Sequence, residues 1–425
     1  MGVGRPLTGV ERVVVVSDDA VESGGAAGIA LLSVRLLAAR GIPVTVLNGS
    51  NPPAFAVPGV DLHSLGQHSI TQGGPIGAAL RGLYSRPAER FVAGWIAAHD
   101  TPGTVYHLHN WHKVLSPSVF RALRGVADRL VMTAHDYFLV CPNGGQFDYP
   151  SGRSCERVPL SADCLRTQCD RRHYAHKLWR AARHWVREQA MDLTRGGATV
   201  IAVHEGMIPY LTRGGIGADR IVVVTNPVMP WCAERIPAET NAGILFVGRL
   251  EADKGVRVVA EAAREAGLSL RIVGDGPLRA DLARDHPEAT LLGWRARGEI
   301  AGIAREARLA VVPTRWRETF GLVSLEAMMS GLPVLVSKHA LIAPGLVALG
   351  GAEQCDPDDR PALAAALGRL ARDDGAIARM SHLGFEKGRA LAPDPEAWCD
   401  RLTDLYESIL IDDRSTAGRS RVQAR

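Results

Sequence analysis

Two glutamates on either side of a glycine turn are the residues of this chain whose spacing most clearly predicts chemistry. Glu318 comes shortly before Gly321, and Glu326 follows further along the same segment. Apolar runs at 309–313 and 334–336 flank it, which predicts a strand, a loop, a helix and a second strand. Because the first turn of a helix has unpaired backbone N–H groups, the turn suits a phosphate. The two carboxylates could then reach opposite ends of one phosphate-containing ligand.

A second loop carries two cations. Arg249 and Lys254 lie between a predicted strand at 244–247 and a helix that begins near Gly255. Two cations beside a helix N-terminus can hold a diphosphate. The alternative is a solvated loop whose charges only cap the helix. Because the same chain also contains the glutamate loop, we favour a diphosphate site over a loop that only caps the helix.

A third loop contains the glycines of a tight turn. Val273-Gly274-Asp275-Gly276-Pro277 resembles the start of a dinucleotide fingerprint, but Arg279 stands where that fingerprint has its third glycine. We therefore interpret it as a turn beside a nucleotide and not as an NAD site.

Size and composition restrict the class of protein. A chain of 425 residues is long enough for two domains, and its composition is that of a globular protein. The net charge of +4 argues against a dedicated nucleic-acid binder. Neither a transmembrane run nor a signal peptide is recognised, so we expect a cytoplasmic protein.

Strand-like runs alternate with helical patterns along the chain, which predicts an α/β fold with two doubly wound domains. The predicted strands are 12–17, 43–47, 104–109, 129–133, 198–202 and 220–224 in the first half, and 244–247, 268–273, 290–292, 309–312 and 333–336 in the second. The predicted divisions are a first domain at 1–228, a linker at 227–241, a second domain at 240–394, a last helix at 395–411 and a disordered tail at 412–425.

Taken together, the three loops resemble the donor half of a family 4 glycosyltransferase, over about residues 240–340. The resemblance implies the GT-B fold, in which two Rossmann-like domains face each other across a cleft and a C-terminal helix returns to the first. It implies that Arg249 and Lys254 neutralise a donor diphosphate and that Glu318 lies near the transferred sugar. Glu326 would bind the ribose. The further donor-binding residues that it implies are Gly248, Gly274, Phe320, Gly321 and Leu322.

The first half carries matching features at predicted strand ends. Gly24 and Gly25 follow the first strand, where the family has a glycine-rich loop whose amides meet the donor; a plain turn is the alternative. His135 follows the strand at 129–133 and resembles the family's active-site histidine. His109, Asn110 and Trp111 lie at the end of the predicted strand 104–109 and are candidates for contacts with acceptor hydroxyls.

The resemblance also implies a retaining reaction, and no carboxylate pair with the short spacing of a retaining glycosidase is evident. We expect a front-face displacement in which the departing diphosphate accepts the proton of the acceptor hydroxyl. The two cations would stabilise that diphosphate, so no cofactor or divalent ion is expected for catalysis. One departure concerns residues 337–342, which replace a glycine-containing turn of the family and predict altered donor-side or inter-domain contacts.

Four cysteines gather in one irregular insertion at about 138–172. These are Cys141, Cys155, Cys164 and Cys169. In a reducing compartment they are candidates for a structural zinc site. Four reduced thiols and an iron–sulfur cluster are the alternatives.

The segment 171–187 combines many cations with Tyr174, Leu178 and Trp185 at helical spacing. It predicts a surface helix that packs by its apolar side. The alternative is contact with anionic lipid or with a lipid-diphosphate acceptor, at the inner face of the membrane.

The sequence therefore predicts a retaining glycosyltransferase that uses a nucleoside-diphosphate sugar, in glycan, glycolipid or exopolysaccharide biosynthesis. The acceptor stays open between a saccharide, a lipid-linked molecule and a small molecule. A non-catalytic nucleotide-sugar-binding protein and a GT-B phosphorylase or epimerase are the competing hypotheses.

Overall fold

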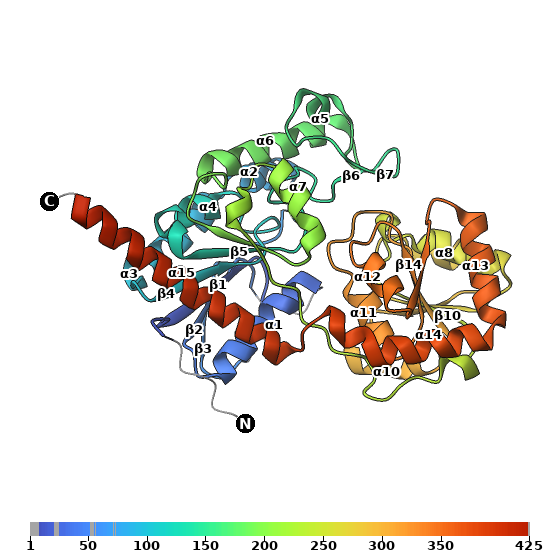
Figure 1. Cartoon of the computed structure of the whole chain (residues 1–425). Helices are drawn as coiled ribbons and strands as arrows, with labels where there is room; N and C mark the ends of the chain where they lie inside the picture. Colours follow the sequence, from blue (N-terminus) through green and yellow to red (C-terminus); the bar gives the residue numbers. More distant parts are fainter. Residues whose placement is uncertain are drawn as a thin grey trace. The chain divides into compact units, whose positions relative to one another are not determined.

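The computed structural model describes residues 8–20, 25–51, 55, 57–70, 72 and 74–423, without the side chains of residue 75 and of 412–423. The chain divides into two compact units. The first unit comprises residues 1–144, 157–225 and 395–425, and the second unit comprises residues 145–156 and 226–394. Each unit is built around its own parallel sheet (Figure 1).

The first unit has the strand order β3-β2-β1-β4-β5-β8-β9, with every described pair parallel. The strands are β1 (Arg12–Ser17), β2 (Val44–Asn48), β3 (Val60–Ser64), β4 (Thr104–Leu108), β5 (Leu130–Ala134), β8 (Thr199–Ala202) and β9 (Ile221–Val223). The run Val13–Val16 of β1 is buried, as its unbroken β-branched sequence requires. In register, Val15 lies between Val46 of β2 and His107 of β4.

Helices connect these strands. They are α1 (Gly25–Ala39), α2 (Pro75–Leu83), α3 (Arg86–His99), α4 (Ser118–Leu123), α5 (Ala162–Arg166), α6 (Tyr174–Ala190) and α7 (Ile208–Arg213). The direction of crossover reverses between β1 and β4, so right-handed connections place helices on both faces of the sheet.

The second unit has the strand order β12-β11-β10-β13-β14-β15, again parallel throughout. Its strands are β10 (Ile244–Val247), β11 (Leu270–Val273), β12 (Thr290–Gly293), β13 (Leu309–Val312), β14 (Val334–Ser337) and β15 (Ala352–Cys355). This is the Rossmann order, with the topological switch point between β10 and β13. Ligands of such sheets bind at the carboxyl ends of the strands beside the switch point.

The helices of the second unit are α8 (Val256–Glu265), α9 (Arg279–Asp285), α10 (Arg297–Arg305), α11 (Leu322–Met329), α12 (Ala343–Ala348), α13 (Arg360–Arg372) and α14 (Asp374–Lys387). A short antiparallel hairpin also belongs to this unit, although the chain on either side of it belongs to the first. Its strands are β6 (Phe147–Asp148) and β7 (Arg153–Ser154).

The predicted α/β fold with two doubly wound domains is confirmed, and the predicted strands all occur. Sequence reasoning missed β3 and β15, which are edge strands. The residues of β3 are mostly exposed, and the sequence Ala-Glu-Gln-Cys of β15 has no apolar run. Edge strands need little burial, so their sequences carry a weak periodic signal.

The C-terminal helix α15 (Pro395–Gln423) belongs to the first unit, as predicted (Figure 1). Trp398, Leu402 and Tyr406 are buried in the same core cluster as Val13 and Val15 of β1. The helix continues past residue 411, where we predicted its end.

The predicted linker at 227–241 packs against the second unit. Trp231, Cys232 and Ile236 are buried, and the backbone amides of Trp231 and Cys232 donate to Ser330 Oγ at 2.8 and 3.2 Å. Ser330 ends α11, so this segment is part of the framework beneath the predicted phosphate-binding helix.

The helix predicted at 171–187 occurs as α6, but the face that we predicted to be buried is exposed. The large apolar residues of α6 are exposed, namely Tyr174, Leu178 and Trp185. The buried polar residues include four of its basic side chains, namely Lys177, Arg183, His184 and Arg187.

Arg183 shows how such an inversion is tolerated. Its Nε donates to the carbonyl of Gly82 at 2.7 Å, and its Nη2 donates to the carbonyl of His112 at 2.6 Å. The guanidinium also lies over the rings of Trp111 and Trp179. Burial lowers the pKa of Arg183 to about 10, which leaves the side chain charged near neutral pH. Paired donors and aromatic faces compensate the lost hydration.

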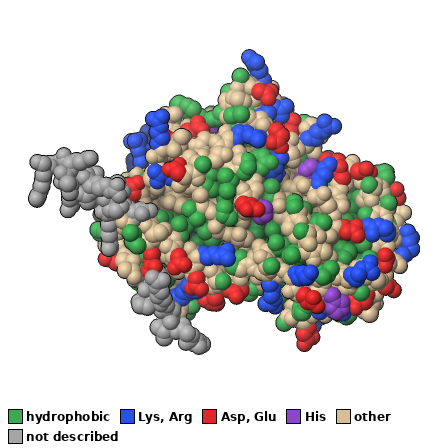
Figure 2. Space-filling view, in the orientation of Figure 1, with side chains coloured by type: hydrophobic (Ala, Val, Ile, Leu, Met, Phe, Trp, Pro, Cys, Tyr) green, Lys and Arg blue, Asp and Glu red, His purple; other side chains and the backbone are tan. Residues whose placement is uncertain are grey.

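Acidic and basic side chains are interspersed on the face shown in Figure 2. Mixed charge of this kind favours solubility. Among the described residues, no helix has the length and apolar content to cross a membrane.

Candidate functional site

Two loops meet at the carboxyl end of β10. The amide of Leu250 donates to the carbonyl of Asp275 at 2.9 Å, and the amide of Leu278 donates to the carbonyl of Leu250 at 3.1 Å. Gly274 has φ +139°, and a Cβ there would lie 1.9 Å from the carbonyl oxygen of Gly248. Gly274 therefore allows the predicted nucleotide-side turn to touch the predicted diphosphate loop.

Lys254 and Glu318 form an ion pair across the switch point. Lys254 Nζ donates to Glu318 Oε2 at 2.7 Å, and each side chain is 18% exposed. The ammonium also lies 5.1 Å from the centroid of the Trp316 ring. The loop after β10 and the loop after β13 thus bring together two residues that sequence analysis assigned to one donor site.

Arg249, the other predicted cation, points to a different partner. Its Nη1 donates to Glu251 Oε1 at 2.8 Å, and more than half of its side chain is exposed. Exposed pairs of this kind contribute little to stability, so Arg249 can leave Glu251 for an anionic ligand at small cost.

The N-terminus of α11 fits the predicted phosphate site. Gly321 precedes the helix with φ +85°, and no side chain caps this end. In the first turn, the buried Ser324 Oγ has no hydrogen-bond partner among the described residues. Phe320 is buried beneath the turn, and Leu322 begins the helix. Uncapped amides and an unsatisfied hydroxyl are the donors that a phosphate accepts from.

Glu326 is held by a residue that the sequence did not single out. Arg297, the first residue of α10, forms an ion pair with Glu326 and donates from Nη2 to the carbonyl of Pro230 at 3.1 Å. Burial raises the pKa of Glu326, although Arg297 and a hydrogen bond with Trp231 act in the opposite direction. A carboxylate with this little hydration gains from hydroxyl donors, which is the requirement for ribose recognition.

The hairpin of β6 and β7 holds the segment just before Glu318. Arg317 Nη1 donates to Gln146 Oε1 at 3.3 Å, and its Nη2 pairs with Glu156. Arg315 Nη2 donates to the carbonyl of Gly152 at 3.5 Å and to Asp358 at 2.8 Å. The glutamate loop is therefore fixed by a segment far away in the sequence.

In the first unit, the structure brings His135 and His109 together. His109 Nδ1 lies 3.0 Å from His135 Nε2, and the two rings are stacked. His107 lies next to His109, with hydrogen bonds from its ring to Tyr406 of α15 at 2.6 Å and to Thr133 at 2.7 Å. The histidine group, defined as His107, His109 and His135, thus connects β4 and β5 with the C-terminal helix.

His107 and His109 are buried, and His135 is half-buried. Burial lowers the pKa of His107 to about 3 and that of His135 to about 4, and it holds the pKa of His109 well below its ordinary value. His109 Nε2 has no hydrogen-bond partner in the described part of the chain. It borders a cavity of about 10 Å³, which has the room of roughly one water molecule.

The other predicted residues of the first unit have structural contacts. Trp111 is buried against Phe120 and Arg183, so its ring is part of the core. Asn110 accepts from the amide of Asp18 through its carbonyl at 2.9 Å and borders the same small cavity as His109. Gly25 begins α1, and Gly24 lies outside the described residues.

The four cysteines fall into both units. Cys141, Cys164 and Cys169 belong to the first unit, and Cys155 belongs to the second. Lys177 of α6 donates to both Cys164 Sγ and Cys169 Sγ at 3.3 Å.

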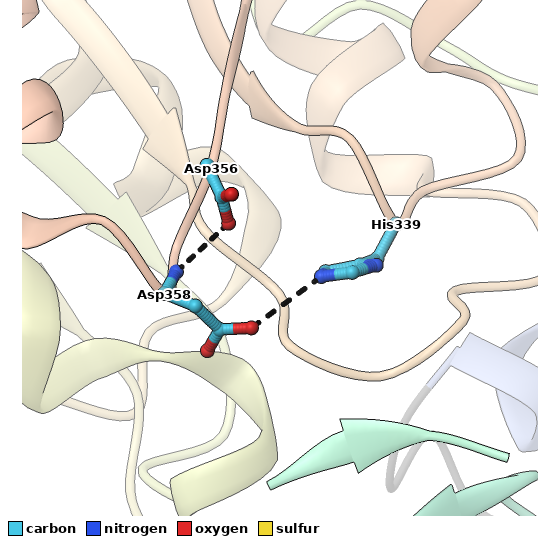
Figure 3. A group of neighbouring side chains, drawn as sticks. All are labelled: His339, Asp356 and Asp358. Carbon is cyan, nitrogen blue, oxygen red and sulfur yellow. Dashed lines mark hydrogen bonds and ion pairs between the residues drawn. The ribbon is translucent and has the colours of Figure 1, made fainter.

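Another group of possible metal ligands lies after β14 and β15. His339, Asp356 and Asp358 offer ligand atoms within 4.8 Å of one another (Figure 3). Each carboxylate already has a cation, since Lys338 pairs with Asp356 and Arg315 pairs with Asp358. Each carboxylate charge is therefore already neutralised, which leaves little negative charge to attract a metal ion. Lys338 and His339 lie in the segment 337–342, where the sequence differs from the family that it resembles.

The fold and this arrangement of loops define a protein of the GT-B class, with two Rossmann-like parallel α/β units in one chain. Residues 241–373 match the family described as glycosyl transferases group 1.

Individual proteins are similar to this chain in sequence or in structure. The chain is 34% identical to the glycogen synthase of Mycobacterium tuberculosis over 180 residues, which is 39% of this chain and 43% of that protein. The chain thus matches less than half the length of this curated relative. Sucrose-phosphate synthase from Thermosynechococcus elongatus has a similar structure, with a TM-score of 0.69 at 19% identity, over 95% of this chain and 100% of that one. The Anabaena protein HepE in complex with UDP-glucose gives a TM-score of 0.64 at 17% identity, over 93% and 99%.

Sequence reasoning missed three residues that the structure brings into these loops, two in the second unit and one in the first. Arg297 stands far from the donor loops in sequence, and no pattern marks it. Ser324 lies inside the recognised segment, where its place in the first helical turn was a usable signal. Asp18 follows β1 and accepts from the amides of Lys113, Val114 and Leu115, which fixes a loop of the first unit. Its position after a strand was visible in the sequence.

Proposed function

We propose that this protein is a retaining glycosyltransferase that moves a sugar from a nucleoside-diphosphate sugar to an acceptor hydroxyl. The observation that carries the proposal is the meeting of Lys254, Glu318 and the uncapped start of α11 at the switch point of the second unit. A diphosphate there would have a cation and free helix amides as donors. Glu326 on the same helix would take the ribose.

The reaction would be a front-face displacement. Lys254, Arg249 and the amides at Gly321 and Leu322 would stabilise the charge that develops on the departing diphosphate. The bond from the anomeric carbon to the phosphate oxygen breaks, and a bond to the acceptor oxygen forms on the same face. The departing phosphate oxygen takes the acceptor proton, so the protein needs no base of its own. Glu318 would position the sugar.

We retain the predicted roles of the first unit as part of the proposal. His135 would contact the donor sugar, and His109 and Asn110 would act on the acceptor side. Since His109 holds His135 Nε2, a change at His109 should alter the orientation of His135 before it alters any acceptor contact. The group 1 match and the UDP-glucose complex of HepE support a nucleotide-sugar donor.

Release of free nucleoside diphosphate tests the proposal most directly. The purified chain should release it from one of a panel of uridine, adenosine and guanosine diphosphate sugars, faster with an acceptor than by hydrolysis. Nuclear magnetic resonance of the product should show the anomeric configuration of the donor. Tight binding without release would instead favour a non-catalytic binding protein. Release that needs inorganic phosphate as the acceptor would favour a phosphorylase, and interconversion of the donor without release would favour an epimerase.

We also propose that the acceptor is reached at an anionic membrane surface. On α2, Ile76 is 77% and Leu80 is 63% exposed, and on α6 Trp185 is 57% exposed. Trp179 joins these helices by donating from Nε1 to the carbonyl of Ala79 at 3.1 Å. Exposed apolar residues at helical spacing, with arginines nearby in the sequence, are typical of interfacial helices.

Liposome flotation tests the membrane proposal separately from donor chemistry. The chain should float with vesicles that contain anionic lipid, and a variant with both Ile76→Ser and Leu80→Ser should float less. The matched control is Val158→Ser, since Val158 is another exposed apolar residue, outside α2 and α6. Equal flotation with neutral and anionic vesicles would contradict the electrostatic part of the proposal.

A further inference from the structure

His107, at the end of β4, has a hydrogen-bond partner on each of its two ring nitrogens. Its Nδ1 lies 2.6 Å from the hydroxyl of Tyr406, and its Nε2 lies 2.7 Å from Thr133 Oγ1. His107 and Tyr406 are both fully buried. Because a neutral imidazole has one donor nitrogen and one acceptor nitrogen, one hydroxyl donates to the ring and the other accepts from it. The ring of His107 is therefore held from two sides by residues of other elements.

The histidine group lies on one face of the first sheet. Residues two apart along a strand point to the same side, so His109 follows His107 on this face, with ring centroids 4.0 Å apart. On the neighbouring strand β5, the same spacing places His135 after Thr133. His109 Nδ1 lies 3.0 Å from His135 Nε2, so the two strands are joined at both levels of this face.

The C-terminal helix α15 covers the same face of the sheet (Figure 1). Val105 of β4 and Val131 of β5 share a core cluster with Leu402 and Tyr406 of this helix. An apolar side chain in place of Tyr406 would leave Nδ1 of His107 without its partner inside that core. An unsatisfied buried polar atom is costly, which explains a hydroxyl on an otherwise apolar side of the helix.

The contacts continue without a break from α15 to His135. Tyr406 fixes one nitrogen of His107, and the ring of His107 packs against that of His109. The ring of His109 then bonds with His135. Hydrogen bonds weaken steeply when their angle changes, so a turn of the His109 ring would weaken its bond with His135. The orientation of His135 thus depends on a residue of the C-terminal helix.

We propose that Tyr406 is a positioning residue for His135 and acts through His107 and His109. Because Tyr406 is fully buried, it cannot contact a substrate itself. Its hydroxyl selects one tautomer and one ring orientation of His107, as the partner of one imidazole nitrogen generally does for the other. The consequence for catalysis rests on the proposed function, in which His135 contacts the donor sugar, whereas the series of contacts does not.

Nitrogen nuclear magnetic resonance of the imidazole rings tests the positioning without an activity assay. Tyr406→Phe keeps the aromatic ring and removes the hydroxyl, so it should shift the ring nitrogen signals of the whole histidine group. A shift confined to His107 would overturn the proposal, because Tyr406 would then satisfy only its direct partner. In the unmodified full chain, His107 and His109 should each report a single tautomer. An average of two tautomers at either ring would also overturn the proposal, even if the variant failed to fold.

The matched control is Tyr106→Phe. Tyr106 is a fully buried tyrosine of β4, and its hydroxyl donates to Asp100 Oδ1 at 2.8 Å. Each variant loses one tyrosine hydroxyl and its hydrogen bond in the same unit, but only Tyr406→Phe should change the signals of His135. Equal changes in both variants would indicate a general loosening of the first unit and would overturn the positioning role.

Transfer kinetics, with the donor found in the nucleotide-release panel, give a second measurement. Tyr406→Phe should lower kcat by about 10-fold or more, because a displaced active-site group loses its alignment. The affinity for free nucleoside diphosphate should stay that of the unmodified chain, since the proposed diphosphate site lies in the second unit. Weaker diphosphate binding with an unchanged kcat would contradict the proposal. If the unmodified chain transferred no sugar, the proposed function would fail, and the ring nitrogen signals would still decide whether Tyr406 positions His135.

Discussion

Replacing Glu318 by glutamine should strengthen the binding of free nucleoside diphosphate while it slows sugar transfer. In the structure, Lys254 already has a partner in Glu318 at 2.7 Å. A diphosphate at this place must draw Lys254 away from that carboxylate or share it. Removing the carboxylate charge while keeping the side-chain shape frees Lys254 for the phosphate and removes a repulsion.

The size of the effect follows from the exposure of the pair. Each side chain is 18% exposed, which lies between a surface pair and a buried one. Surface pairs are worth up to about 1 kcal/mol, and hydrogen bonds to charged groups about 1.5–3 kcal/mol. We therefore expect a gain of about 1–2 kcal/mol, which corresponds to roughly 5- to 30-fold tighter binding of the diphosphate. Lys254→Met should weaken the same binding by about 10- to 150-fold, because it removes a charge-assisted contact.

Isothermal titration calorimetry with the nucleoside diphosphate at fixed ionic strength measures both effects. A variant with both substitutions completes a double-mutant cycle and gives the coupling between the two side chains. Lys387→Met, an exposed lysine at the end of α14, is the matched control and should bind like the unmodified chain. If Glu318→Gln weakened diphosphate binding as much as Lys254→Met does, the idea that Glu318 competes with the diphosphate for Lys254 would be refuted. The pair would then act as one structural unit.

Further predictions concern the pH dependence of stability, the backbone conformation at Gly255 and the binding of ribose by Glu326. The pKa of His135 is about 4 when folded, against about 6.5 when unfolded, so its contribution to stability is full above pH 6.5 and is lost as the pH falls toward 4. His135→Gln should reduce the acid slope of the unfolding free energy by up to about 1.4 kcal/mol per pH unit over that window, and an unchanged slope would contradict this prediction. Gly255→Ala should cost at least about 1–2 kcal/mol in urea unfolding, because φ is +71° and because a Cβ would lie 2.1 Å from the carbonyl oxygen of Pro313, whereas Gly298→Ala, with open space around it, should be near neutral; equal costs would contradict this argument. Glu326→Gln should weaken a ribonucleoside diphosphate about 10-fold or more in calorimetry and leave its 2′,3′-dideoxy analogue unchanged; an equal loss for both would reject the ribose contact.

Local sequence patterns were sufficient to predict the strands and the turn that carry the loops after β10 and β13. Glu318, Gly321 and Glu326 lie in one short segment whose flanking apolar runs define β13 and β14. Their relation follows from strand and helix geometry alone, since the glycine sets the turn and the helix spaces the carboxylates. The same reasoning applies to Lys254 at the end of β10. Parallel strands end at the same edge of a sheet, which brings its loop to that of Glu318.

Patterns within one element were not sufficient where buried charge decides the packing. The repeat of Tyr174, Leu178 and Trp185 predicted the inner face of α6, yet these residues are exposed. Lys177 and Arg183 are buried because partners from elsewhere in the chain satisfy their donors, namely two sulfurs for Lys177 and two backbone carbonyls for Arg183. A periodicity argument counts apolar residues on one helix and cannot include partners that only folding supplies.

The sequence by itself determined the two α/β units, the strands beside the switch point and the residues that lie on the loops after β10 and β13, because each depends on neighbours along the chain. The tertiary structure alone decided which side chains pair. It placed Arg297 on Glu326, Gln146 beside Arg317, and His109 between His107 and His135. These contacts join residues whose separation along the chain leaves no local pattern. They form because burying the rest of each unit brings them within reach and makes an unpaired polar group costly.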